Sequence, residues 1–223
     1  MKPIEIRAAG TTDPGLVRSE NQDCIVVEPG LGLYLVFDGM GGHQGGEVAS
    51  ALARDTVVEC IRASRFKKDP KALMEEAFQL ASRRVHEEAA RTPNLHGMGT
   101  TCVALLFLND KVVMGHVGDS RIYLVRNGTL HQLSEDHTYA NDAIRHGMMT
   151  PEQAYASRYA DMITRAVGVQ ETVVVDTFAF DVLVNDIWGG DSLIDWGRNF
   201  WEHDLDRGLR AVRNGIETHI VTT

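Results

Sequence analysis

Cysteine is scarce in this sequence, and the residues that occur are isolated. Cys24, Cys60 and Cys102 lie far apart and form no Cys-x-x-Cys pair. An odd number of scattered cysteines argues against a disulfide framework and against a zinc knuckle. A reducing compartment suits such a chain best, so the sequence predicts a cytoplasmic protein.

Long apolar runs and an excess of basic residues are also missing. No run approaches the ~20 apolar residues that cross a bilayer, and residues 1–7 lack the apolar core of a signal peptide. Lys and Arg number 22 against 31 Asp and Glu, a formal net charge of -9. The sequence therefore predicts a soluble protein without a nucleic-acid or membrane partner, whereas an acidic excess suits a cation site.

What is present is ordinary for one globular domain. The chain has 223 residues, of which 43% are hydrophobic and 24% are charged, and this is enough for a single sizeable core. No internal repeat, low-complexity tract or linker interrupts the sequence. Residues 1–223 are therefore predicted to form one domain.

The central stretch is residues 33–47, where an apolar run meets a carboxylate and a glycine-rich loop. Residues 33–37 are all apolar and rich in β-formers, which predicts a buried strand. A helix is predicted from Glu47 onward, so Asp38 would stand at a strand end facing a loop. Strand ends with loops are where functional sites are commonly built.

Hydrophobic periodicity predicts helices together with antiparallel strands. One amphipathic helix is expected after Glu47 and a second after Pro70. Turn signals at Pro29-Gly30 and Asn127-Gly128 favour hairpins, and the strands between residues 102 and 133 are interpreted as one antiparallel meander. The predicted strands are residues 3–10, 24–28, 33–37, 102–107, 112–117, 122–125, 130–133, 173–180 and 182–188.

Residues 134–162 are polar and mixed in character, which suggests a small subdomain at the surface. Thr150 and Gln153 have the spacing of a capping box, and Pro151 stands at the first helical position. A short helix is therefore expected to begin there.

The glycine-rich loop permits a second interpretation, a dinucleotide-binding site. A strand, a Gly-x-Gly at residues 39–41 and a helix follow in the order that such a site needs. A third glycine would be due where Gln44 stands, and the first helix is followed by another helix rather than a second parallel strand. The spacing and the antiparallel strands disfavour a Rossmann-type fold.

Three carboxylates stand at predicted strand ends. Asp23 precedes one strand, Asp38 ends another, and Asp119 lies in the turn between two more. If those ends converge, the site offers hard oxygen ligands, which suit Mg²⁺ or Mn²⁺ better than zinc or copper. Taken singly, each aspartate is more often a turn or cap residue than a ligand, so both interpretations stay open.

Several motifs follow one another along the chain. They are Thr12-Asp13-x-Gly15-x-x-Arg18-x-x-Asn21-Gln22-Asp23, Asp38-Gly39-Met40-Gly41-Gly42-His43-x-x-Gly46-Glu47-x-Ala49-Ser50, Gly99-Thr100-Thr101, Gly118-Asp119-Ser120-Arg121-x-Tyr123, Asp136-His137-Thr138 and Ile163-Thr164-Arg165-Ala166-Val167-Gly168. Together they resemble the metal-dependent protein Ser/Thr phosphatases, the PPM or type 2C family, in their bacterial form. The likeness covers roughly residues 5–188, and ordered motifs of that extent are far more specific than a lone glycine loop.

The resemblance implies a fold class and a metal centre. The fold would be α+β, with two packed antiparallel β-sheets (a β-sandwich) flanked by α-helices on both sides and a flap-like subdomain around residues 134–162. Two Mn²⁺ or Mg²⁺ ions would be bridged by Asp38, with the carbonyl of Gly39 as a further ligand. Asp23 would hold one ion through water, and Asp119 would help to bind a third, weakly held ion.

The resemblance also implies a mechanism and its catalytic residues. Ions about 3.5 to 4 Å apart share and deprotonate a water, and the hydroxide attacks phosphorus in line without a covalent phosphoenzyme. Arg18 would grip the phosphate through its planar fork of donors. His43 would protonate the leaving Ser or Thr oxygen, whereas His137 is expected to be structural.

The last part of the sequence departs from the family pattern. Where the family carries Ser-Asp-Gly, this chain has Gly190-Asp191-Ser192, so Asp191 would supply the expected carboxylate. A late Asp-Asn pair is absent, and Glu217 is the nearest carboxylate. Divergence, a family member that binds without turnover, and a tail altered by a frame error or truncation remain as explanations.

The first functional hypothesis is a protein phosphatase that acts on phosphoserine and phosphothreonine in substrates of a Ser/Thr kinase. The alternative is a catalytically impaired family member that binds phosphoprotein or metal through Arg18 and the acids of the first half. A dinucleotide-binding enzyme is the third and disfavoured hypothesis. Specificity would lie in residues 134–162 and their surface loops.

Overall fold

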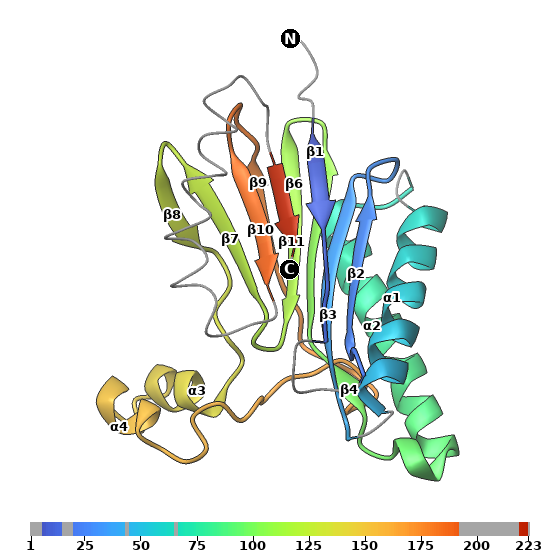
Figure 1. The fold of residues 1–223 in the computed structure, drawn as a ribbon, viewed down its shortest axis with the longest axis vertical. Helices are drawn as coiled ribbons and strands as arrows, with labels where there is room; N and C mark the ends of the chain where they lie inside the picture. Colours follow the sequence, from blue (N-terminus) through green and yellow to red (C-terminus); the bar gives the residue numbers. More distant parts are fainter. Residues whose placement is uncertain (1–5, 15–19, 43–44, 65–66, 192–218, 223) are drawn as a thin grey trace.

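The structure is a computed structural model that describes residues 6–14, 20–42, 45–64, 67–191 and 219–222. For residue 191 and residues 219–222 it describes the backbone only. Two β-sheets pack face to face, and two long helices cover the outer face of one sheet (Figure 1). The predicted class, an α+β sandwich, is confirmed.

The six-stranded sheet is antiparallel throughout. Its strands in spatial order are β2 (Asp23–Glu28), β3 (Leu33–Met40), β5 (Cys102–Leu108), β6 (Lys111–Val117) and β9 (Asp176–Asp181), with β4 (Gly99–Thr100) paired to the end of β3. The β2–β3 hairpin is the one predicted from Pro29-Gly30. β3 continues beyond the predicted strand to Met40, because Gly39 and Met40 pair with β4.

The five-stranded sheet contains the first and the last strands of the described chain. Its spatial order is β1 (Arg7–Gly10), β11 (His219–Thr222), β10 (Ile187–Asp191), β7 (Arg121–Arg126) and β8 (Thr129–Gln132). β7 and β8 form the hairpin predicted at Asn127-Gly128, where both residues have positive φ. β11 runs parallel to both of its neighbours, whereas the other pairs are antiparallel.

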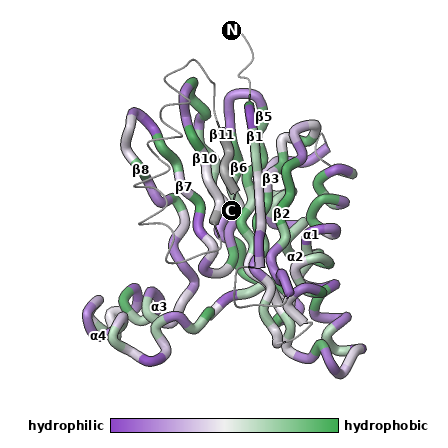
Figure 2. The backbone as a smooth tube through the Cα atoms, in the orientation of Figure 1, coloured by the Kyte–Doolittle hydropathy of each residue, from purple (hydrophilic) through white to green (hydrophobic). Residues whose placement is uncertain are grey.

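The helices α1 (Gly45–Ser64) and α2 (Pro70–Arg91) pack against each other and on the six-stranded sheet. Asp69 caps α2 by accepting a hydrogen bond from the Ala72 N–H, and Pro70 occupies the first helical position. Hydrophobic and hydrophilic colours alternate along both helices in Figure 2, as expected for helices with one buried face. Helices on the second flank of the sandwich stay a prediction.

Two apolar layers hold the fold together. One lies between the helices and the six-stranded sheet and includes Leu35, Phe37 and Phe78. The other lies between the sheets, where the Phe107 ring makes edge-to-face contacts with Tyr34 and Trp188. Alternate residues of β3 belong to different layers, as the period of a strand requires.

A small helical unit lies apart from the sandwich. α3 (Tyr139–Arg145) and α4 (Pro151–Tyr155) stand below β7 in Figure 1 and share a cluster of buried alanines. The capping box predicted at Thr150 is confirmed, since Thr150 and Gln153 each bond the other's backbone N–H. α3 was not predicted. A short 3-10 turn at Pro93–Leu95 joins α2 to β4.

The predicted meander between residues 102 and 133 is wrong in one respect. β5 and β6 belong to one sheet and β7 and β8 to the other, so the turn at Gly118-Asp119-Ser120 crosses between the sheets. All residues of β7 except its two ends are buried, as are those of β6 after Lys111. Because these strands are covered on both faces, their sequences show no alternation that would reveal the crossing.

The two late strands also begin later than predicted. Residues 173–175 form a loop because the backbone of Val173 bonds to the side-chain amide of Gln79 on α2. Residues 182–186 form a turn in which Asn185 has positive φ and Asp186 pairs with Arg126. Only from Ile187 does the chain resume as β10.

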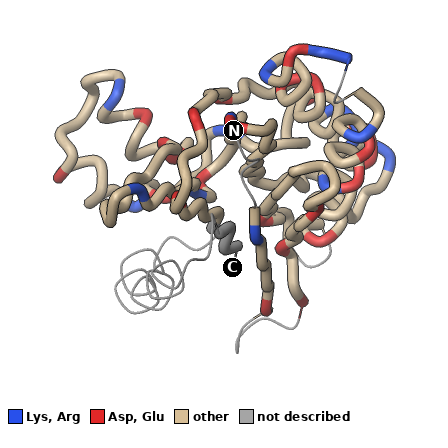
Figure 3. Tube along the Cα trace, turned by 90° about the horizontal axis from the view of Figure 1, so that it is seen from above, with Lys and Arg blue, Asp and Glu red and all other residues tan. Residues whose placement is uncertain are grey.

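Charge and hydropathy add two observations. Figure 3 shows basic and acidic residues interspersed along the described chain rather than gathered by sign. No helix in the described ranges is long and apolar enough to cross a membrane.

Candidate active site

The carboxylates of Asp23 and Asp38 stand side by side at one edge of the sandwich. Asp23 opens β2, Asp38 lies near the end of β3, and the two are register partners in the antiparallel pair. Residues directly opposite in such a pair have Cβ atoms about 4.5–5.5 Å apart. Along β3, Tyr34 and Val36 face the layer between the sheets, so strand alternation places Asp38 and its partner on that same face.

The main chain of Asp38 is held on both sides. Its N–H donates to the Thr101 hydroxyl at 3.0 Å, and its carbonyl accepts from the Thr101 N–H at 2.9 Å. The Thr100 hydroxyl donates to the same carbonyl at 2.9 Å. The backbone position of Asp38 is therefore fixed by the Gly99-Thr100-Thr101 motif.

Gly39 allows three segments to meet at this edge. Its N–H donates to the Gln22 carbonyl at 3.1 Å, and a Cβ at this position would lie 2.0 Å from the Gly46 carbonyl oxygen. Only glycine fits so close an approach of backbone to backbone. The end of β3 and the first turn of α1 are thereby in contact.

Asp119 lies in the turn that crosses from β6 to β7. It is only 9% exposed, and burial raises the pKa of its carboxyl above the ordinary value. The turn is bent by Gly118, whose φ is +107°, and Ser120 is joined to Thr101 by a hydroxyl–hydroxyl hydrogen bond of 2.6 Å. Thr101 therefore connects the turn of Asp119 to the main chain of Asp38.

The remaining predicted site residues are placed only in part. Asp191 ends β10 as the register partner of Arg121, two residues after Asp119, so its backbone reaches the same edge. Arg18, His43 and Glu217 lie outside the described residues, and their roles remain predictions.

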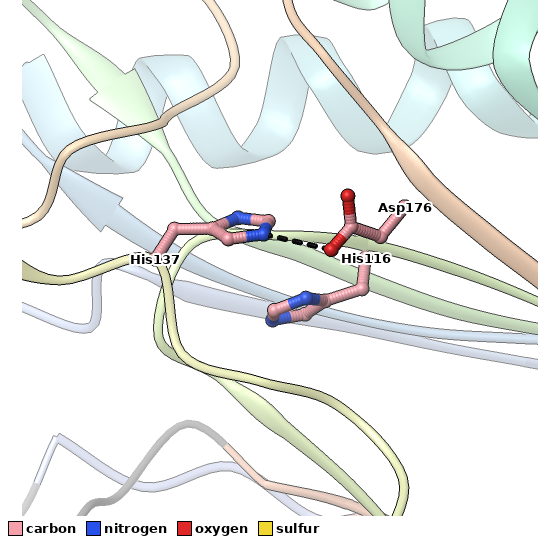
Figure 4. Close-up of side chains that lie close together, drawn as sticks. All are labelled: His116, His137 and Asp176. Atoms are coloured by element: carbon pink, nitrogen blue, oxygen red, sulfur yellow. Dashed lines mark hydrogen bonds and ion pairs between the residues drawn. The ribbon is translucent and has the colours of Figure 1, made fainter. Parts of the chain in front are cut away.

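The structure also reveals a polar cluster of His116, His137 and Asp176, which come from β6, the loop before α3 and the start of β9 (Figure 4). His137 Nε2 lies 3.1 Å from Asp176 Oδ2, and the ring centroids of His116 and His137 are 4.6 Å apart. His137 was expected to be structural, whereas His116 and Asp176 were missed. The three residues are distant in sequence, and no spacing rule connects them.

The hydrogen bonds of this cluster argue against an ion at its centre. The Gly118 N–H donates to His137 Nδ1 at 3.1 Å, so we assign the proton of the neutral ring to Nε2. That proton is directed at Asp176, and the Arg165 guanidinium lies 3.0 Å from the same carboxylate. A ligand atom that carries a proton beside a fixed cation does not suit a metal. The cluster instead anchors the loop before α3 to the Gly118 turn.

A second ion pair supports the same loop. Arg121 donates from two nitrogens to the Asp136 carboxylate, with distances between 2.6 and 3.0 Å. Such two-point contacts fix orientation as well as distance. The turn that carries Asp119 is thus held from both β7 and the loop at residues 136–138.

The sandwich is that of a PPM-type protein phosphatase. The chain belongs to the protein phosphatase 2C family, whose sequence model matches residues 17–174. The resemblance inferred from the motifs is thereby confirmed.

Relatives of this chain include proteins named as Ser/Thr phosphatases of bacteria. The chain is 35% identical over 168 residues to the serine/threonine protein phosphatase PstP of Mycobacterium tuberculosis, a match that covers 75% of this chain and 32% of PstP. It is 35% identical over 173 residues to the serine/threonine phosphatase stp of Listeria welshimeri, covering 75% of this chain and 69% of that protein. The chain thus spans about a third of the length of PstP and most of the length of stp.

Solved structures agree with the fold. A crystal structure of the M. tuberculosis phosphatase PstP/Ppp matches with a TM-score of 0.70 and 32% identity, covering 78% of this chain and 72% of that one. Stp1 of Staphylococcus aureus matches with a TM-score of 0.69 and 29% identity, covering 77% and 69%. The catalytic domain of PstP, solved in complex with two manganese ions, matches with a TM-score of 0.65 and 32% identity, covering 78% and 71%.

Proposed function

We propose that this protein is a metal-dependent serine/threonine phosphatase that hydrolyses phosphoserine and phosphothreonine in proteins. The observation that carries the proposal is that Asp23 and Asp38 are register partners on one face at a sandwich edge, while Thr101 and Ser120 link Asp38 to the turn of Asp119. Membership of the protein phosphatase 2C family supports it.

The residues at this edge suit two Mn²⁺ or Mg²⁺ ions. Asp23 and Asp38 place two carboxylates on one face, and like charges so close favour a cation between them. Asp119 is nearly buried, and its raised pKa reflects the cost of holding a charge there, which a cation would offset. Carboxylate and carbonyl oxygens are the ligands that these hard cations prefer. The complex of PstP with two manganese ions supports the same assignment.

Each residue then has a role in the proposed reaction. Bound ions supply Lewis-acid activation of a water and neutralise charge on the phosphate. Asp38 would hold both ions together with the Gly39 carbonyl, while Asp23 would hold one of them through water. Asp119 would help to bind a third ion, and the late carboxylates Asp191 and Glu217 would complete the set of oxygen ligands.

Two further residues would act on the substrate itself. Arg18 would bind the phosphate oxygens through two parallel N–H donors and so orient the phosphorus. His43 would give a proton to the departing Ser or Thr oxygen, a role that suits histidine because this residue type commonly exchanges protons near neutral pH.

The substrates would be phosphoproteins made by a Ser/Thr kinase in the same cytoplasm. Residues 134–162, which include α3 and α4, would act as a flap-like subdomain that selects among them. The formal net charge of -9 disfavours nucleic acids and anionic membranes as partners.

Phosphopeptide hydrolysis with added Mn²⁺ tests the proposal. The Asp38→Asn variant should lose on the order of 100-fold or more in kcat/KM, because a metal centre supplies several kcal/mol of the transition-state stabilisation. Asp181→Asn is the matched control. Asp181 is exposed and pairs with Lys111 at the start of β6, whereas the turn of Asp119 follows the other end of β6. Its activity should equal that of the wild type.

Three outcomes would contradict the proposal. Hydrolysis that needs no metal would exclude a metal-dependent mechanism, and full activity in Asp38→Asn would remove the central ligand. Phosphopeptide binding without turnover would favour the alternative of a non-catalytic binding protein, which neither the described residues nor the comparisons support.

A further inference from the structure

We propose that Thr101 is a positioning residue for the metal centre, because its hydroxyl sets the distance between the carboxylates contributed by the two sheets. Asp38 belongs to one sheet, whereas Asp119 lies just before β7 of the other. This role rests on the proposed function, since it concerns the ions that the same edge would hold.

The first step of the argument is the direction of the hydrogen bonds. The Asp38 N–H donates to Thr101 Oγ1, so this oxygen is an acceptor there, and its own proton is free to point to Ser120 Oγ at 2.6 Å. One hydroxyl therefore accepts from the strand that carries Asp38 and reaches the turn that carries Asp119.

The second step is burial. Thr101 is 1% exposed and Ser120 is fully buried, so water does not replace either partner. Hydrogen bonds in such surroundings are strong, and removal of one partner leaves the other with its full desolvation penalty. The geometry of Asp38 and Ser120 is consequently coupled through Thr101.

The third step is the packing of the threonine methyl group. Gly118 has a positive φ, and a Cβ added there would lie 2.6 Å from Thr101 Cγ2. The methyl group thus fills the space beneath the turn, while the hydroxyl group bonds to it. Valine at this position keeps the methyl contact and removes only the hydrogen bonds, so the two contributions are separable.

The consequence concerns metal affinity more than substrate contact. Residues that orient metal ligands without contacting the ion typically contribute about 10- to 100-fold in metal affinity or activity. Thr101→Val should therefore raise the dissociation constant for Mn²⁺ by about 10- to 100-fold. Thr101→Ser keeps the hydroxyl and should restore the affinity to within about threefold of the wild type.

The experiment is a calorimetric titration of the metal-free full chain with Mn²⁺, paired with thermal unfolding of each variant. Thr56→Val is the matched control, because Thr56 is also fully buried and donates to the Leu52 carbonyl within α1, at 2.8 Å. It should lose thermal stability as Thr101→Val does but bind Mn²⁺ like the wild type. Ser120→Ala probes the same bond from its other end and should weaken binding about tenfold.

The outcomes separate this inference from the proposed function. A wild type that binds no Mn²⁺ and hydrolyses no phosphopeptide overturns both. A wild type that does both, with unchanged Mn²⁺ affinity in Thr101→Val, overturns the positioning role alone. If Thr101→Val does not fold, Ser120→Ala decides: weakened binding supports the role, and unchanged binding overturns it.

Discussion

At the scale of single residues, the buried imidazole of His116 has an unusual acid–base property. Its Nε2 donates to the Ser120 carbonyl at 2.9 Å, and its ring is fully buried. Burial, reinforced by the neighbouring His137, lowers the pKa of His116 to about 4. The Asp176 carboxylate nearby raises the pKa of His116, and the Arg165 guanidinium lowers it. The folded protein therefore keeps this ring neutral over a range in which the unfolded chain protonates it.

We expect this difference to make stability depend on pH in the acidic range. Below about pH 6.5 the unfolded chain binds a proton at His116 that the folded protein does not bind. The free energy of unfolding therefore falls as the pH falls toward 4. Between pH 7 and pH 5 the contribution of this residue is about 2 kcal/mol. Urea unfolding of the metal-free protein at both pH values should show a smaller fall in His116→Gln than in the wild type.

His131 offers the control for this measurement. It lies on the exposed strand β8, so His131→Gln should retain the wild-type fall in stability. Equal falls in the wild type and His116→Gln would contradict the assignment of the pH dependence to His116.

At the scale of elements, the turns and caps are determined locally, whereas the sheet to which a strand belongs is not. The Thr150 capping box and the Asn127-Gly128 hairpin occur where their residue types predict them. α4 has only five residues, and its helical unit has its own small cluster of alanines. Helices this short depend strongly on their caps. The stability of α4 should therefore respond to Thr150 without affecting the sandwich.

Thr150→Ala should destabilise α4 by about 1 kcal/mol, because it removes the acceptor for the Gln153 N–H. Amide hydrogen exchange at Gln153 and Ala154 should become about fivefold faster. Exchange at the β5 amides should not change, and Thr129→Ala on the exposed strand β8 should leave α4 as it is. A uniform acceleration across the sandwich would show that α4 is not a separate unit of stability.

At the scale of the whole molecule, the two sheets depend on a shared aromatic contact. Phe107 of the six-stranded sheet lies edge-to-face against Trp188 of the five-stranded sheet, with ring centroids 5.9 Å apart. Both side chains are at most 2% exposed. Because the proposed metal site takes residues from β3 and from the turn before β7, the stability of this layer bears on the proposed site as well as on the fold.

Phe107→Ala should lower the free energy of unfolding by about 3 to 5 kcal/mol, the usual cost of a large cavity in a core. Phe178→Ala is the matched control, because Phe178 is 49% exposed and its loss should cost less than about 0.5 kcal/mol. Urea unfolding of both variants checks the prediction. Similar losses in the two variants would contradict a packed layer between the sheets at Phe107.

The sequence by itself determined the family, the hairpins, both long helices and the aspartates at strand ends. These features depend on local patterns: alternation within a strand, glycine and asparagine at turns, and motifs in a fixed order. Asp23, Asp38 and Asp119 were placed at strand ends for this reason, and in the structure Asp38 pairs with Asp23 and is linked through Thr101 and Ser120 to the turn of Asp119.

Only the tertiary structure decided the crossing at Gly118, the bond between Thr101 and Ser120, and the cluster around His137. Each of these joins segments that are separated along the chain, through polar groups whose partners no local periodicity specifies. A buried hydroxyl or imidazole must find a partner, but which partner it finds depends on how the sheets pack. The tertiary structure thus adds the hydrogen bonds that hold the predicted aspartates in place.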